Sequence, residues 1–200
     1  MKNHLPSSNA AWSKLVKSNV HGLETISINR FVARYRLAKS FKSMEFEGYK
    51  DVTVSAYNTI FQLFLSYSAL DILFKGIKQN KQIAKYKKSI YSIKIKDEQL
   101  AKRLKLNISF MNMLINNTTD DSTKEELVKF HKEPLRTNMM GIARGCRHLT
   151  AHGEMSAAGS TALNKKNAAD LKLLSDLVLV AADNAFTDFV ESFNKSSKGS

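Results

Sequence analysis

Four side chains that can bind an anion or transfer a proton follow one another at helical spacing near residue 150. Arg144, His148 and His152 lie four residues apart, so a helix places them one above another, with Arg147 beside them. A guanidinium matches the geometry of a phosphate group, and an imidazole can give or take a proton near neutral pH. This row therefore suits an anion-binding or acid–base site better than it suits a packed core.

Other interpretations of the same segment remain open. His148 and His152 have the spacing of zinc ligands on a helix, but Leu149 stands where metalloproteases carry glutamate, and only Glu154 lies nearby as a third ligand. Cys146 is either a nucleophile activated by its basic neighbours or a buried structural thiol. The two histidines may equally be exposed polar residues that complement a helix dipole. We expect no metal and no cofactor.

The helix that carries these residues has signals at both of its ends. Pro134 suits a first turn, so the sequence predicts a helix from Leu135 to about His152. Gly153 suits the C-terminal stop, because glycine readily adopts the left-handed backbone that ends many helices.

Apolar residues recur at helical spacing through most of the chain. A stripe joins Ile28 to Phe41, and a long, mostly apolar helix is predicted from about Val52 to Ile77. The remaining predicted helices are a short one capped by Ser7 or Ser8, one over residues 97–115, one opened by the capping box Ser122-x-x-Glu125, and a last one capped by Asn167.

Composition supports the same fold class. The chain has 200 residues with only 8 Gly and 2 Pro, too few for a sandwich or barrel that turns every few residues. We expect an all-α bundle of about five to seven helices, forming one domain over residues 1–195, with a disordered tail at 196–200.

Positive charge is concentrated in the first half of the chain. Residues 1–106 contain 20 Lys or Arg against 7 Asp or Glu, whereas residues 107–200 contain 11 of each. The densest run lies between residues 75 and 105, and its members include Lys85, Lys87 and Lys88. Such a field attracts polyanions, so we expect RNA as a partner, with these three lysines contacting phosphate. A solvated surface that keeps the protein soluble is the alternative.

The segment Arg147-His148-Leu149-Thr150-Ala151-His152 resembles the R-polar-x3-H motif of HEPN domains, the all-α "higher eukaryotes and prokaryotes nucleotide-binding" superfamily. The trailing Gly153 and the place of the motif before a long closing helix are also similar to that family. The resemblance implies a helical bundle that forms a homodimer, with the two motif helices facing a shared cleft. It further implies a metal-independent endoribonuclease of the toxin or phage-defence type, with a nucleotidyltransferase-like antitoxin as a partner of the toxin form.

Carried over to this chain, the resemblance assigns a role to each residue of the motif. Arg147 would hold the scissile phosphate, and His152 would be the general base or acid for attack by the RNA 2′-hydroxyl. His148 would orient His152 or touch phosphate. Arg144 lies outside the motif and is expected to be an auxiliary phosphate contact. Arg147 and His152 are about 140° apart on an ideal helix, so a second copy of the chain is needed to complete the cleft.

Two further readings compete with the nuclease. One is a non-catalytic HEPN-like module that binds nucleic acid, a nucleotide or a partner protein, and the other is an all-α scaffold without a ligand. We expect a cytoplasmic protein with no membrane contact. The most apolar stretch, Ile60 to Phe74, is interrupted by polar residues and too short to span a bilayer, and the lone Cys146 fits a reducing compartment.

Overall fold

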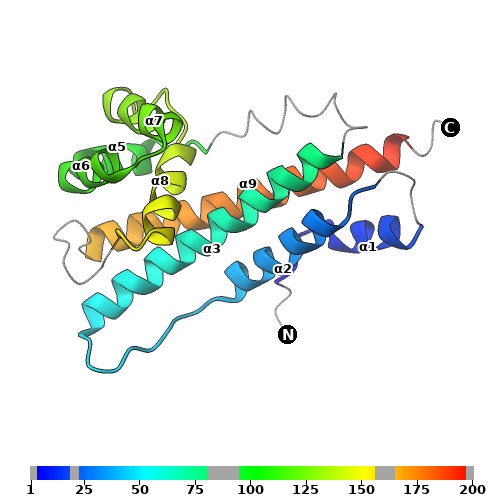
Figure 1. Ribbon diagram of the computed structural model, residues 1–200, viewed down its shortest axis with the longest axis horizontal. Coiled ribbons are helices and arrows are strands. Elements are labelled where there is room, and N and C mark those ends of the chain that lie inside the picture. The colour runs from blue at the N-terminus through cyan, green and yellow to red at the C-terminus, as the bar shows by residue number, and fades with distance from the viewer. Residues whose placement is uncertain (1–3, 19–22, 81–94, 156–164, 197–200) are drawn as a thin grey trace. The chain divides into compact units, whose positions relative to one another are not determined.

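The computed structural model describes residues 4–18, 23–80, 95–155 and 165–196. Within these ranges the protein contains helices and no strand, which confirms the all-α class (Figure 1). The helices are α1 (Asn9–Lys17), α2 (Ile26–Ser40), α3 (Asp51–Gln79), α5 (Glu98–Leu106), α6 (Ile108–Asn117), α7 (Asp121–Lys132), α8 (Met140–Ala151) and α9 (Lys165–Ser196). Lys85, Lys87 and Lys88 lie outside the described residues, as does the predicted tail beyond Ser196.

The chain divides into two compact units, and the long helices α3 and α9 contribute a segment to each. One unit comprises Met1–Ser40, Ser68–Ile93 and Leu179–Ser200, and the other comprises Phe41–Tyr67 and Lys94–Val178. The single domain expected over residues 1–195 stays a prediction.

Aromatic side chains form the core of the first unit. The ring of Trp12 lies 6.2 Å from that of Phe186 and 6.1 Å from that of Phe189, and Phe31 lies 5.1 Å from Phe186. The Trp12 indole donates its N–H to the Asn29 side chain at 2.9 Å, so the polar end of this large ring is satisfied. The predicted stripes of α2 and α9 therefore face each other in this core.

Small side chains allow close helix packing in both units. In the first, a Cβ on Gly76 would lie 2.6 Å from Cδ1 of Ile28, so α2 and α3 approach as closely as glycine permits. In the second, the hydroxyls of Ser66 and Ser175 share a buried hydrogen bond of 2.7 Å between α3 and α9. Each contact fixes the register of two helices at a single point.

The second unit carries α5 to α8, and α8 packs against α6 and α7. Its fully buried side chains come from each of these helices: Leu100, Leu104, Phe110, Met111, Leu114, Leu127, Ile142 and Leu149. The site predicted on α8 therefore rests on a platform of short amphipathic helices.

α3 is longer than the sequence indicated. It is the one helix among the described residues that is long and apolar enough, by length and composition, to cross a membrane, and 56% of its most apolar window is buried inside the protein. Core helices of soluble proteins meet the same criterion. The stretch from Ile60 to Phe74 is thus part of a helix of 29 residues, which corrects the shorter span expected from its interrupting polar residues.

The predicted helix over residues 97–115 was wrong, because the chain breaks at Asn107. The Asn107 side chain accepts a hydrogen bond from the Phe110 amide at 3.2 Å and begins α6, while its own amide bonds back to Leu104 at 3.2 Å. An asparagine side chain competes with the backbone in this way and favours caps over helix interiors. The break adds one helix to the five to seven that were expected.

Two predicted helix starts also differ from the structure. α7 is capped by Asp120 rather than by Ser122: the Asp120 carboxylate accepts a 2.8 Å bond from the Thr123 amide and a further bond from the Ser122 hydroxyl. α9 begins at Lys165, so Asn167 lies inside the helix and is buried instead of capping it. The better-placed acceptor at Asp120 satisfies the orphan amides, and Ser122 then follows as a helical residue.

α8 begins at Met140 and not near Leu135. Residues 134–137 form turns in which the Thr137 amide bonds to the Glu133 carbonyl at 3.1 Å, and the Asn138 side chain accepts from the Met140 amide at 3.1 Å and from the Ile95 amide at 2.9 Å. The Pro134 signal was therefore misread, because proline also favours turns. Gly48 and Gly153 do end or separate helices as predicted, with φ of +80° and +72°.

Candidate functional site

The C-terminal half of α8 is held tightly against the rest of its unit. Ile142, Cys146 and Leu149 form the buried face of the helix. A Cβ on Gly145 would lie 3.2 Å from the side chain of Leu127 in α7, so the two helices meet at this glycine. The polar residues of α8 consequently project from a rigid support.

The two histidines of the motif lie against each other at the end of this helix. The ring centroids of His148 and His152 are 4.5 Å apart, with 54° between the ring planes. His148 is half-buried, whereas His152 is exposed and caps the helix. The four-residue spacing thus brings the two imidazoles into contact, as the sequence indicated.

A hydroxyl from a neighbouring loop fixes His148. The Nε2 atom of His148 lies 2.9 Å from Oγ1 of Thr119, a residue between α6 and α7. A hydrogen bond to one ring nitrogen of histidine sets the tautomer and the orientation of the ring. Thr119 therefore positions His148, and His148 in turn supports the exposed ring of His152.

The helix stops directly after His152. Gly153 adopts a left-handed backbone, and the amides of Glu154 and Met155 return to the Leu149 carbonyl at 2.9 and 3.2 Å. Such C-terminal bonds satisfy carbonyls that the helix would otherwise leave free. The turn keeps the His152 ring at the surface.

Arg144 holds α8 to two other helices. Its Nε donates to the Tyr67 hydroxyl of α3 at 2.9 Å, and one terminal nitrogen lies 3.4 Å from Oε1 of Glu126 in α7. Burial acts to lower the pKa of the Arg144 guanidinium, but Tyr67 and Glu126 outweigh that effect and leave the pKa above its ordinary value. The predicted phosphate contact of Arg144 remains a prediction, and in this structure the side chain serves as a tie between helices.

Arg147 is half-buried on the same helix. Its position one residue before His148 places it about 140° around the helix from His152, which agrees with the spacing argument from the sequence. The structure brings His148 and His152 together, but it does not bring Arg147 and His152 to one face.

The other readings of this segment meet specific features of the structure. Cys146 is 2% exposed, and burial raises the pKa of its thiol far above the ordinary value, which is the environment of a structural cysteine and not of a nucleophile. Among the described residues there is no group of three or more His, Cys, Asp or Glu side chains that could hold a metal ion. Glu154, the suggested third zinc ligand, is exposed.

Sequence reasoning did not find the residues that support the motif. Thr119 drew attention only as part of a polar cluster, and Tyr67 and Glu126 stand 77 and 18 residues from Arg144 along the chain. No local pattern links such positions, because their contacts arise only when α3, α7 and α8 pack together.

Comparison with protein-family models, with curated proteins and with solved structures finds no match to this chain. The function is therefore argued from the site itself.

Proposed function

We propose that this protein is a metal-independent endoribonuclease of HEPN-like type that cleaves RNA by attack of the 2′-hydroxyl on the adjacent phosphorus. The observation that carries the proposal is the pair of imidazoles, 4.5 Å apart, at the exposed end of a helix that also carries two arginines. RNA cleavage of this kind needs a proton acceptor, a proton donor and a cation for the phosphate, and all three types of group stand here within nine residues.

The reaction assigns one task to each group. His152, the exposed imidazole, takes the proton from the 2′-hydroxyl as the new bond from O2′ to phosphorus forms. The bond from phosphorus to O5′ breaks, and an imidazolium gives its proton to the leaving oxygen. The products are a 2′,3′-cyclic phosphate and a 5′-hydroxyl, and Arg147 stabilises the negative charge that builds on the phosphate oxygens.

His148 acts through its neighbour in this mechanism. Its contact with Thr119 uses Nε2, so the ring is held in place while its face meets His152. We assign His148 as a positioning residue for His152, a narrower role than the catalytic one expected from the sequence.

A homodimer completes the proposed site. Arg147 and His152 of one helix point about 140° apart, so each phosphate would meet Arg147 of one copy and His152 of the other. RNA and a second copy of the chain are thus the proposed partners, with a nucleotidyltransferase-like antitoxin for a toxin, and the cytoplasm is the proposed compartment. The basic first half of the chain, including Lys85, Lys87 and Lys88, would draw RNA towards the dimer.

The test is cleavage of end-labelled RNA in EDTA by the wild-type protein, His152→Ala and His131→Ala. His131 is a half-buried histidine on α7 outside the motif, so its variant controls for the loss of an imidazole as such. We expect His152→Ala to lower the cleavage rate by a factor of about 10² to 10⁴, the usual contribution of acid–base catalysis, and His131→Ala to keep it. A substrate with a single 2′-deoxyribose at the cleaved linkage should resist the wild-type protein.

Two outcomes would overturn the assignment. Undiminished cleavage by His152→Ala would show that the nuclease activity comes from another site or a contaminant. Salt-dependent binding of RNA by a wild-type protein that never cleaves it would instead favour the non-catalytic HEPN-like module.

A further inference from the structure

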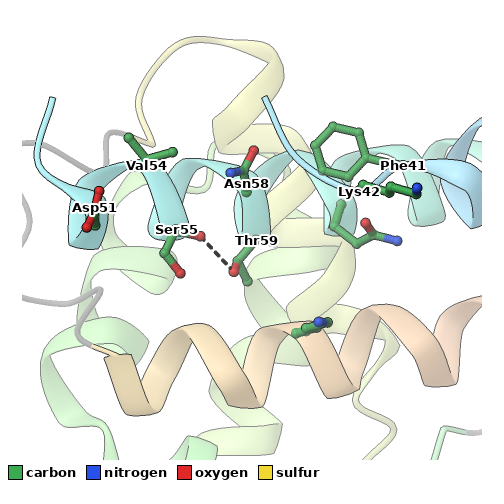
Figure 2. Close-up of a pocket in the computed structure, with 9 residues that line it drawn as sticks. Phe41, Lys42, Asp51, Val54, Ser55, Asn58 and Thr59 are labelled. Carbon is green, nitrogen blue, oxygen red and sulfur yellow. Dashed lines mark hydrogen bonds between the residues drawn. The ribbon is translucent and has the colours of Figure 1, made fainter. Parts of the chain in front are cut away.

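A hollow of about 340 Å³ lies on the first four turns of α3, away from the motif residues of α8 (Figure 2). Its lining comes from the chain just after α2, from α3 and from α9, all within the unit that also contains α8. The volume is at the lower end of the range for small-molecule pockets and suits one nucleotide rather than a duplex.

The wall of the hollow on α3 is polar and held in shape. Asn58 accepts a hydrogen bond from the Met44 amide at 2.6 Å and donates to the Met44 carbonyl at 3.3 Å, which fastens the loop before α3 to the helix. Thr59 donates to the Ser55 carbonyl at 3.0 Å (Figure 2). The hollow is therefore built by fixed groups and not by a loose loop.

Charge is divided between the two ends of the hollow. Lys42 lies beside Phe41 at one end, and Asp51 lies at the other, in the first turn of α3 (Figure 2). Lys172 of α9 also lines the space. Among the described residues neither lysine has a carboxylate oxygen within 4.0 Å, so no printed ion pair neutralises the two ammonium groups.

We propose that this hollow binds one nucleotide of a single-stranded RNA, with its phosphate between Lys42 and Lys172 and its base against the ring of Phe41. Two lysines from distant parts of the chain give a dianionic or diester phosphate its counter-charge, and an aromatic ring accepts any base by stacking. Asp51 keeps the phosphate at the lysine end and accepts a hydrogen bond from a ribose hydroxyl or a base amino group. The inference rests on the proposed function for the identity of the polymer.

The place of the hollow along α3 defines how it would serve the α8 site. Arg144 ties α8 to α3 at Tyr67, and at about 1.5 Å per residue the hollow extends from about 8 Å (Gln62) to about 24 Å (Asp51) from that tie. A strand that reaches both places is several nucleotides long. The hollow is thus a subsite for longer RNA and would contribute nothing to a dinucleotide substrate.

The test measures binding of a labelled ten-nucleotide RNA to the full chain in the His152→Ala background, which prevents cleavage. Lys42→Ala/Lys172→Ala is compared with Lys124→Ala/Lys129→Ala, a control that removes the same charge from exposed positions of α7. Each lost phosphate contact on a single strand lowers the salt slope by about 0.7, so the hollow variant should lose about 1.4. That slope corresponds to about 25-fold weaker binding at 0.1 M than the loss expected near 1 M salt. All four lysines are exposed, so these variants should fold.

Phe41→Leu separates stacking from charge. It keeps an apolar side chain and removes the ring, and we expect at least about fivefold weaker RNA binding with an unchanged salt slope. Adenosine monophosphate is the competitor that distinguishes a strand from a free nucleotide.

The outcomes separate this inference from the nuclease assignment. If both lysine pairs weaken RNA binding equally, or if adenosine monophosphate binds as tightly as the RNA, the subsite is overturned even though His152 remains essential for cleavage. If the hollow variants behave as expected and the wild-type protein never cleaves RNA, the subsite stands and the nuclease falls.

Discussion

Arg144 is predicted to stabilise the fold mainly through Tyr67 and only weakly through Glu126. The bond from Nε to the Tyr67 hydroxyl measures 2.9 Å and ends on a residue that is 5% exposed, whereas the contact with Glu126 measures 3.4 Å. The side chains of Arg144 and Glu126 are 35% and 40% exposed, so water and salt screen their attraction.

These differences set the expected magnitudes. A hydrogen bond to a charged group contributes about 1.5–3 kcal/mol, and the partial exposure of the guanidinium reduces this to about 1–2 kcal/mol for the pair with Tyr67. A half-exposed ion pair contributes about 0.2–0.5 kcal/mol. The variant Arg144→Met should therefore lower the free energy of unfolding by about 1.5–2.5 kcal/mol.

Double-mutant cycles measure each pair separately. One cycle combines Arg144→Met with Tyr67→Phe, and the other combines it with Glu126→Gln, with urea unfolding followed by circular dichroism. Each cycle subtracts whatever else the two side chains contact, so the coupling energy belongs to the pair. Raising the salt from about 0.05 M to about 0.5 M should diminish the Glu126 coupling and leave the Tyr67 coupling nearly unchanged.

Equal coupling in the two cycles, or a coupling with Tyr67 below about 0.5 kcal/mol, would contradict this account. Either result would mean that α8 is fixed by its buried face alone.

Three further predictions concern the surroundings of the site. Thr119→Val removes the bond to His148, and we expect a lower kcat for RNA cleavage with an unchanged KM and a changed pH profile, whereas unfolding by urea should shift little. Gly153→Ala places a side chain at φ +72° and should lower the free energy of unfolding by about 1 kcal/mol, measured in the same way. Hydrogen bonds from the Thr123 hydroxyl and amide, with a smaller one from Ser122, lower the pKa of Asp120 from 3.8 to about 2. Its stabilising contribution is therefore complete above about pH 4 and lost as the pH falls towards 2, and the acid limb of the stability curve should be shallower in Asp120→Asn.

Much of the fold could be predicted because helices are encoded locally. The apolar stripes of α2 and α9 follow a 3.6-residue repeat, and the sequence therefore indicated which faces are buried, including those of Phe31 and Phe186. The helix ends were harder. At Asn107 and Asp120 a short polar side chain captures a backbone amide, and several residues nearby could have done the same.

The sequence by itself determined that His148 and His152 share one face of a helix, because four residues make slightly more than one turn. It also determined the all-α class and the excess of positive charge in the first half of the chain. Only the tertiary structure decided that Thr119 holds His148, that Arg144 faces Tyr67, and that Lys42 and Lys172 line one hollow. These partners are separated by 29, 77 and 130 residues, and packing brings them together through buried side chains that leave no local pattern in the sequence.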